Sequence, residues 1–305
     1  MCSVGAETRC SRRRDEGRAN NEDVADYAQA SVHAVVDGTF APSTQLSITL
    51  PEASLRRFVQ AFSSRDLLPA SMPAALVTAL LAMPDRYNIS GRTPAAVLWH
   101  DDNAKRDGVQ VGEFTWGLVP TWSKTPETPY TTVTARLQRA PRSRIFRRPW
   151  ERRHCVVPMN GYYKWDRSVK PAVPYFIQAQ DGKALLAAGL WETWSKGDAP
   201  LHTFTILTHP NAAIPAPLVA DGPVFLPHKD WHPWITEALW FPMRYLTTQP
   251  QPALEAYRVS RAIRDRTRDD YTLLEPAAAG DPVAGEASGE DDSDVWDDDE
   301  ADDDR

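Results

Sequence analysis

The sequence predicts one strand-rich domain with a few helices, set between two segments of different composition. Short apolar or alternating runs, separated by Pro, Gly, Asp and Lys, follow one another from residue 95 to residue 227. A hydrophobic content of 42% in 305 residues is enough for one large core. The acidic charge is concentrated in residues 281–305, which hold 13 of the 41 Asp and Glu residues and one of the 34 Lys and Arg residues.

These observations place the expected domain at residues 44–276. Without residues 281–305 the chain keeps 33 basic and 28 acidic residues, so the domain is mildly basic. Residues 1–43 show no sustained period and are interpreted as a largely disordered extension. Residues 277–305 are interpreted as a disordered acidic tail, because a block of like charges repels itself and buries little apolar surface. Such a tail either solubilises the chain or mimics a nucleic acid and competes for a basic groove.

Three helices are expected. The first spans residues 52–62, where Thr49 and Glu52 form a capping box and four apolar residues share one face: Leu55, Phe58, Val59 and Phe62. The second covers "MPAALVTALLAM", residues 72–83, and ends at a proline. The third lies around "RSRIFRRPWERR", residues 142–153, and carries many arginines.

Eight runs are expected to form strands around these helices. They are "AAVLW" (95–99), "EFTWGLV" (113–119), "YTTVTA" (130–135), "HCVVPM" (154–159), "YFIQA" (175–179), "ALLAAGLWETW" (184–194), "HTFTILT" (202–208) and "GPVFLP" (222–227).

Cysteine and histidine usage excludes several classes of site. Three cysteines are too few and too unevenly spaced for a disulfide framework or a structural zinc site, so no metal and no cofactor are expected. Cys155 lies in an apolar run and is interpreted as an inert core thiol, and its neighbour His154 is expected to point to the opposite face of the strand. Without a run of about 18 apolar residues or a signal peptide, the chain is predicted to be soluble and cytoplasmic, or nucleoid-associated in a bacterium.

Seven stretches stand out by their order and spacing. They are "RYNIS" (86–90), "WGLVPTWSK" (116–124), "TARLQRAPRSRIFRRPWERRHCVVPMNGYYKW" (134–165), "PYFIQAQDGKALLAAGLWETW" (174–194), "FTILTHPNA" (204–212), "GPVFLP" (222–227) and "YRVSRAIRD" (257–265). Together they resemble the SOS-response-associated peptidase (SRAP) family, the abasic site processing proteins. The resemblance implies a single α+β domain, with a curved β core flanked by helices and a positively charged channel that holds single-stranded DNA. It implies a monomer without a cofactor.

The chemistry of the resembled family begins at a cysteine that removal of the initiator Met exposes. Its α-amine and thiol condense with the aldehyde of an abasic site into a thiazolidine ring, while an asparagine positions the sugar and a glutamate and a histidine move protons. At the matching positions this sequence has Thr134, Lys164 and Val219. Cys2 does follow Met1, but about 50 residues separate it from the first predicted helix.

The residues that would bind DNA are better preserved. By the resemblance, Arg136 and Arg144 match backbone contacts of the family, and Trp116, Trp122 and Trp165 match aromatic positions beside the lesion. Positive charge together with aromatic faces is what single-stranded DNA binding requires. Core packing is the alternative role for each tryptophan.

Two main hypotheses follow from the sequence. In the first, the chain binds single-stranded or abasic DNA and has impaired or lost crosslinking; in the second, it is an active enzyme that crosslinks through Cys2. In a third hypothesis, the amine of Lys164 forms an imine with the aldehyde of the abasic site. Alternatively, Lys164 has a structural role and forms a charge pair with Asp221.

Overall fold

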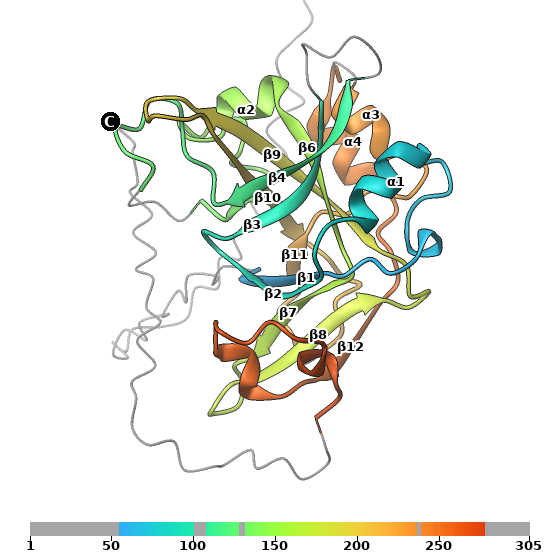
Figure 1. Cartoon of the computed structure of the whole chain (residues 1–305). Helices are drawn as coiled ribbons and strands as arrows, with labels where there is room; N and C mark the ends of the chain where they lie inside the picture. Colours follow the sequence, from blue (N-terminus) through green and yellow to red (C-terminus); the bar gives the residue numbers. More distant parts are fainter. Residues whose placement is uncertain (1–54, 101–107, 128–131, 237–238, 278–305) are drawn as a thin grey trace, which may run out of the picture. The chain divides into compact units, whose positions relative to one another are not determined.

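The computed structural model describes residues 55–100, 108–127, 132–236 and 239–277, which form two β-sheets and several short helices (Figure 1). The strand-rich α+β class predicted from the sequence is confirmed. Cys2, the extension 1–43 and the acidic tail from residue 278 onward lie outside the described residues.

Five strands of the larger sheet close into a barrel. β3 pairs with β4 and β6, β9 pairs with β6 and β10, and β10 returns to β4. The β10–β4 pairing is parallel and the other four are antiparallel. The strands are β3 (Pro94–His100), β4 (Val109–Trp116), β6 (His154–Met159), β9 (Leu185–Trp194) and β10 (Leu201–Pro210).

The second half of β10 has two further partners. It pairs with β5 (Thr134–Arg136) in parallel and with β11 (Asp221–Pro223) in antiparallel orientation. Thr208 pairs with Arg136 on one side and with Pro223 on the other. β5 and β11 therefore flank the same end of β10.

The smaller sheet contains five antiparallel strands in the order β12, β8, β7, β1, β2. Only Asn160 separates β6 of the barrel from β7 of this sheet. The strands are β1 (Arg57–Gln60), β2 (Arg86–Ser90), β7 (Gly161–Asp166), β8 (Val173–Ala179) and β12 (Leu254–Arg258).

Alternate residues of the barrel strands contribute to two different cores, as the pleat of a strand requires. Ala95 and Val97 of β3 pack with Trp116 and Phe204 inside the barrel. The intervening residues of β3 pack outside it, in a cluster that includes residues of α1 and α3. Phe58 and Tyr162 of the smaller sheet belong to the inner cluster, so this sheet and the barrel share a core.

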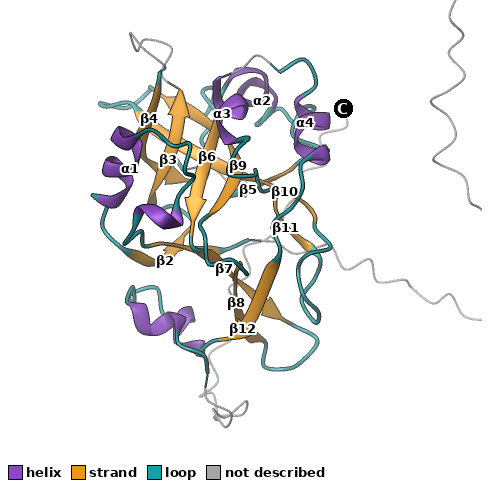
Figure 2. Cartoon of the chain, turned by 90° about the vertical axis from the view of Figure 1, so that its right-hand side faces the viewer, coloured by secondary structure: helices purple, strands orange, loops and turns teal. Residues whose placement is uncertain are grey.

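Short helices cover the outer face of the barrel (Figure 2). They are α1 (Ala74–Leu81), α2 (Arg147–Arg152), α3 (Trp231–Thr236) and α4 (Pro242–Thr248). The 3₁₀ helix η1 (Arg65–Leu67) precedes α1, whereas η2 (Arg261–Arg264) and η3 (Tyr271–Leu274) pack against the smaller sheet. The predicted helices at residues 72–83 and 142–153 are confirmed, although the second is only six residues long. All eight predicted strand runs contain strand, but those at 130–135 and 222–227 are reduced to parts of the short β5 and β11.

The predicted helix at residues 52–62 is wrong, because residues 57–60 form strand β1. Hydrogen bonds to β2 on one side and to β7 on the other hold it, and all four of its residues are buried. A strand covered on both faces loses the alternation of polar and apolar residues that identifies strands. The Gln60 side chain also joins the two sheets, since its amide donates to the carbonyl oxygens of Ala96 (2.8 Å) and Pro158 (2.7 Å).

His154 connects two of these helices from the first position of β6. Its imidazole stacks on Trp234 with ring centroids 3.8 Å apart, and its two ring nitrogens lie 2.7 Å from the Trp150 carbonyl oxygen and 3.0 Å from that of Trp234. Burial lowers the pKa of His154, while the two carbonyl contacts oppose this shift. Burial therefore favours the neutral imidazole at this position.

We expect the free energy of unfolding to fall as the pH drops below about 6.5, the ordinary pKa of histidine. In that range the unfolded chain binds a proton that the folded chain excludes at His154. The loss is at most about 1.4 kcal/mol per pH unit for one histidine. Urea unfolding at several pH values checks this. His154→Gln should reduce the slope, and the exposed control His232→Gln should keep it; equal slopes in the two variants would contradict the assignment.

Candidate nucleic-acid interface

The end of β10 gathers two positions that the sequence identified as functional. Thr134 pairs with Ile206 and Arg136 with Thr208, so β5 sets both residues along one side of β10. Both side chains are partly exposed. Next along β10, the His209 ring nitrogen Nδ1 lies 3.0 Å from the side-chain nitrogen of Gln138. Sequence reasoning missed this contact, because 71 residues separate its members and only the β5–β10 pairing joins them.

Lys164 approaches the same region from β7. It is 8% exposed, and its Nζ donates to the main-chain carbonyl oxygen of Asp221 at 2.7 Å. Asp221 opens β11 and pairs with Pro210. The sequence suggested a charge pair between Lys164 and the Asp221 carboxylate, and this hydrogen bond brings Lys164 to the main chain of the same residue. The contact fixes the amine between the smaller sheet and β11.

Tyr162 precedes Lys164 by two residues, so both side chains lie on the same face of β7. Tyr162 is fully buried, and its hydroxyl has no hydrogen-bond partner among the described residues. A Cβ added to Gly222 would lie 3.2 Å from the hydroxyl oxygen, which places the hydroxyl against β11. Burial and the nearby Asp221 both raise the pKa of Tyr162, so the phenol stays protonated.

Val219 lies in the segment that leads into β11 and is 66% exposed. The Asp221 amide donates to the Val219 carbonyl oxygen at 2.9 Å, which closes a tight turn before the strand. The aliphatic side chain at this position carries no group that could move a proton.

Trp122 and Arg144 form an exposed pair although 21 residues lie between them in the sequence. The guanidinium carbon of Arg144 lies 4.7 Å from the centre of the Trp122 ring, and Trp122 is 40% exposed. Lys196 also reaches this loop, because its Nζ donates to the Trp122 carbonyl oxygen at 2.9 Å. The Trp194 indole donates to the Ser123 carbonyl oxygen at 3.0 Å and holds the loop against β9. Sequence reasoning gave no role to either residue, since Lys196 lies outside the matched stretches and Trp194 only ends one of them.

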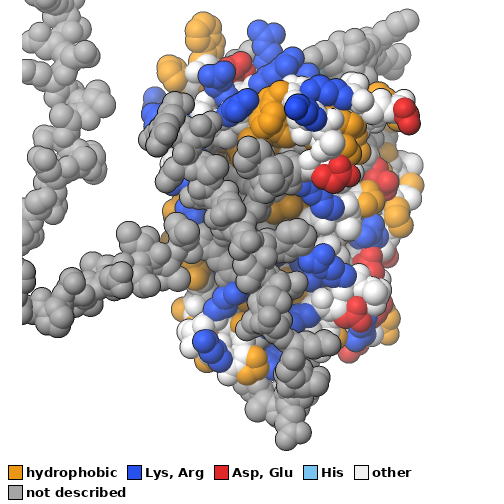
Figure 3. All heavy atoms as spheres, turned by 90° about the vertical axis from the view of Figure 1, so that its left-hand side faces the viewer, with side chains coloured by type: hydrophobic (Ala, Val, Ile, Leu, Met, Phe, Trp, Pro, Cys, Tyr) orange, Lys and Arg blue, Asp and Glu red, His pale blue; other side chains and the backbone are white. Residues whose placement is uncertain are grey.

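Further basic side chains are exposed in the segment that contains Arg144. Figure 3 shows Lys and Arg from the top to the bottom of the face on which the β9–β10 turn lies, with Asp and Glu mainly along one side. The arginines of the segment before and within α2 are exposed, in agreement with the sequence: Arg139, Arg142, Arg144, Arg147, Arg148 and Arg152.

Two predicted DNA-contacting tryptophans have other surroundings. Trp116 is completely buried, packs against Phe58 with ring centroids 4.9 Å apart, and donates its indole N–H to the Val133 carbonyl oxygen at 2.7 Å. A buried ring has no free face for a base, so Trp116 supports the segment before β5. Trp165 lies on the face of β7 opposite to Lys164 and packs with the small cluster around Ile263. Of the three predicted tryptophans, Trp122 is the most exposed and Trp165 is partly exposed, so a stacking role stays a prediction for these two.

The cysteine and histidine at the start of β6 behave as the sequence predicted. Cys155 is fully buried inside the barrel, and burial raises the pKa of its thiol well above the ordinary value. His154 contacts the helices outside the barrel instead. Within the described ranges, no three His, Cys, Asp or Glu side chains converge on a metal position.

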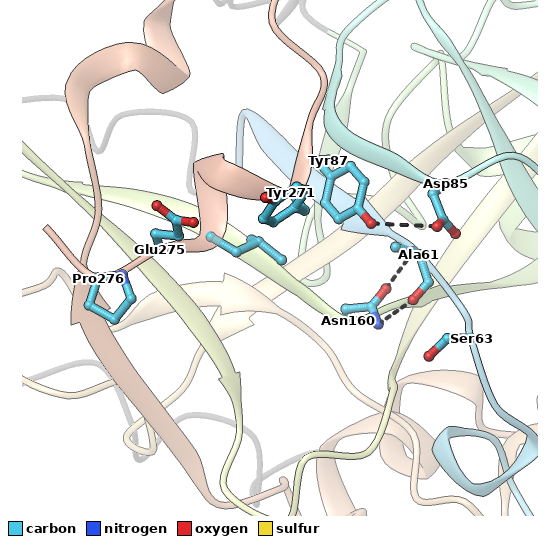
Figure 4. A pocket seen from close by; sticks show the side chains of 9 residues that line it. Ala61, Ser63, Asp85, Tyr87, Asn160, Tyr271, Glu275 and Pro276 are labelled. Atoms are coloured by element: carbon cyan, nitrogen blue, oxygen red, sulfur yellow. Dashed lines mark hydrogen bonds between the residues drawn. The ribbon is translucent and has the colours of Figure 1, made fainter.

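A pocket of about 440 Å³ lies away from all of these residues (Figure 4). The Tyr87 hydroxyl donates to Asp85 Oδ2 at 3.4 Å across it, and the Asn160 side chain binds both main-chain groups of Ala61. Burial and the carboxylate of Asp85 raise the pKa of Tyr87. None of the predicted site residues lines this pocket, whose lining residues are Ala61, Ser63, Asp85, Tyr87, Asn160, Tyr271, Leu274, Glu275 and Pro276.

Comparison with known proteins identifies the family to which this two-sheet fold with a closed barrel belongs. The family model described as SOS response associated peptidase (SRAP) matches residues 55–266. The chain belongs to the SRAP family.

Named relatives agree with this assignment. The abasic site processing protein YoaM of Bacillus subtilis is 28% identical over 195 residues, which cover 62% of this chain and 84% of YoaM. An abasic site processing protein of Saccharomyces cerevisiae is 38% identical over 124 residues, which cover 40% of this chain and 32% of the yeast protein. The chain therefore spans about a third of the yeast relative and most of the bacterial one.

Solved structures share the fold. A crystal structure of a protein from Bacteroides thetaiotaomicron superposes with a TM-score of 0.58 at 21% identity, over 72% of this chain and all of that one. A protein from Bordetella bronchiseptica gives a TM-score of 0.51 at 23% identity, over 67% of this chain and 99% of that one. Among the described residues, no helix has the length and apolar character needed to cross a membrane.

Proposed function

We propose that this protein binds single-stranded DNA, with abasic DNA as its specific ligand, as part of a response to DNA damage. The Trp122–Arg144 pair is the observation that carries the proposal. It supplies an exposed aromatic face and a positive charge within 4.7 Å of each other, which is the combination that binds bases and phosphates of a single strand. Arg136 and Lys196 add further charge, and the names of the relatives supply the abasic site.

The crosslinking step of the family is proposed to be impaired or lost. The asparagine, glutamate and histidine expected for it are replaced by Thr134, Lys164 and Val219. A group that transfers a proton in the transition state is typically worth about 10²- to 10⁴-fold in rate. Three simultaneous replacements therefore favour a protein that holds the lesion over one that forms a thiazolidine at the family's rate.

An active crosslinking enzyme is the second candidate, because Cys2 follows Met1 as the chemistry requires. Removal of Met1 would expose an α-amine and a thiol on adjacent carbons, and both can add to an aldehyde. Intact mass of the purified chain shows whether Met1 has been removed.

A gel comparison separates the two candidates. The full chain is mixed with abasic or intact single strands, and each mixture is run on a native gel and on a denaturing gel. The binding proposal predicts a shifted native band that is lost at high salt, and no Cys2-dependent band on the denaturing gel. A denaturing band that is specific to abasic DNA and disappears in Cys2→Ala would establish the enzyme instead.

Arg136→Ala tests whether binding uses the proposed surface. We expect severalfold weaker binding and a shallower salt dependence, by about 0.7 in the slope of log K against log salt for one lost phosphate contact. Arg266→Ala removes the same charge from an exposed position after η2 and is the matched control. Equal effects of the two variants would contradict the location of the site.

The remaining expectations concern the whole chain. We propose that it acts as a monomer in the cytoplasm or on the nucleoid. The acidic tail, residues 277–305, would compete with DNA for the basic face or bind a basic partner, because its charge is opposite to that of the exposed arginines.

A further inference from the structure

Lys164 differs from the other described lysines in its surroundings. Of the lysines that the structure describes, Lys164 alone is buried, at 8% exposure. The other five are exposed: Lys124, Lys170, Lys183, Lys196 and Lys229. Removing an amine from water disfavours its charged form, and this is a general way in which proteins make lysine a nucleophile. A solvated lysine keeps its hydration, whereas a buried one loses it, so the burial of Lys164 requires an explanation.

The position of the amine relates it to the proposed DNA site. Its hydrogen bond ends at the carbonyl oxygen of Asp221, the first residue of β11. β11 and β5 flank the same end of β10, where Thr208 lies between Pro223 and Arg136. Neighbouring strands are about 4.8 Å apart, so β5 and β11 are separated by about 10 Å. The amine therefore lies at β11, on one side of this end of β10, and Arg136 lies on β5, on the other side.

A second polar group on the same face of β7 has no assigned role. The Tyr162 hydroxyl is buried and has no hydrogen-bond partner among the described residues, and it lies against Gly222, the residue after Asp221. A buried hydroxyl without a partner is costly, so it requires an explanation, and a role in binding or catalysis is one such explanation. The amine and the phenol are therefore both directed at the Asp221–Gly222 main chain from one strand.

We propose that Lys164 captures the abasic site as an imine, which rests on the binding function proposed above. The Nζ lone pair of the neutral amine attacks C1′ of the ring-opened sugar aldehyde, and the C=O π electrons move to the oxygen. The nitrogen loses one proton and the oxygen gains one, which gives a carbinolamine. The hydroxyl then leaves with a second proton as water while the C=N bond forms. The sum is aldehyde plus amine to imine plus water, without oxidation or reduction.

Tyr162 is assigned to the proton movements of this step. A neutral phenol can donate a proton to the departing hydroxyl and regain one from the nitrogen, so it ends unchanged. The site would thus form an imine, which water hydrolyses, where the resembled chemistry forms a stable thiazolidine. A reversible bond suits a protein that holds a lesion and later releases it.

Borohydride trapping tests the proposal, because reduction converts the imine into an amine that survives a denaturing gel. The full chain is incubated with an abasic single strand, reduced and separated. We expect a trapped band in the native chain and in Cys2→Ala, with at least a tenfold loss in Lys164→Arg, which keeps a charged donor toward Asp221. Lys183→Arg is the matched control, because Lys183 is an exposed lysine in the turn between β8 and β9, outside the proposed binding surface.

The native chain supplies a readout that does not depend on the folding of a variant. An adduct at Lys164 blocks tryptic cleavage there, so peptide 154–167 should carry the reduced sugar fragment in place of the free peptide 154–164. Trapping at another lysine, or unchanged trapping in Lys164→Arg, would overturn the proposal. Absence of any trapped band while the native gel shows DNA binding would overturn it and leave the binding function intact. Absence of DNA binding would overturn both.

Discussion

Replacing Trp122 by alanine is expected to weaken binding of single-stranded DNA by about 10- to 100-fold. A base stacked on an aromatic side chain contributes about 1–3 kcal/mol. Trp122 presents a ring that is 40% exposed, and Arg144 lies 4.7 Å from its centre. The substitution removes both the stacking face and the support that orients Arg144, so the whole contribution is lost.

Fluorescence anisotropy with a labelled single strand measures this effect. Trp240→Ala is the matched control, because Trp240 is 92% exposed and lies before α4, outside the proposed surface. We expect it to bind as the native chain does. If Trp122→Ala binds the single strand as the native chain does, or if both variants lose the same affinity, the Trp122–Arg144 pair is not part of the binding surface.

The second large effect concerns stability. Glu192 of β9 is 1% exposed, and its carboxylate forms an ion pair with Arg153, the residue that follows α2. The Arg153 guanidinium also lies 5.2 Å from the centre of the Trp191 ring. Arg153→Met leaves a buried carboxylate without its cation, so we expect the free energy of unfolding to fall by about 3 kcal/mol.

Urea unfolding of the native chain and three variants tests whether the unpaired Glu192 carboxylate causes this loss of stability. Arg152→Met removes an exposed charge one residue earlier and should change stability by less than about 0.5 kcal/mol. The double variant Arg153→Met with Glu192→Leu should recover much of the loss, because no buried charge remains. A double variant no more stable than Arg153→Met would show that the arginine acts through packing on Trp191.

Much of the fold could be predicted from the sequence, since the order of apolar runs follows the order of strands. The helix placed at residues 52–62 failed for a physical reason: β1 has partners on both sides and is covered on both faces, so Phe58 and Val59 are buried together. That environment depends on β7, which lies about 100 residues further along the chain. Local patterns cannot report such a partner.

The candidate site was less predictable than the fold. The identities of Arg136, Arg144 and Trp122 came from motifs, and the structure adds that two of them touch. The burial of Trp116 could not be inferred, because a tryptophan in a strand faces either solvent or core depending on the register of the sheet. The hydrogen bond from Lys164 to Asp221 spans 57 residues and two sheets, so only the assembled topology shows where this amine points.

The most direct test of the central claim is a salt titration of binding to one labelled sequence, as a single strand and as a duplex. If Arg136, Arg144 and Lys196 neutralise phosphates, the single strand should bind more tightly than the duplex, with log K falling by about two per decade of salt. Binding should become tighter still when the strand carries an abasic site. No binding of the single strand at low salt, or binding that salt does not change, would contradict the claim that this SRAP domain holds single-stranded DNA.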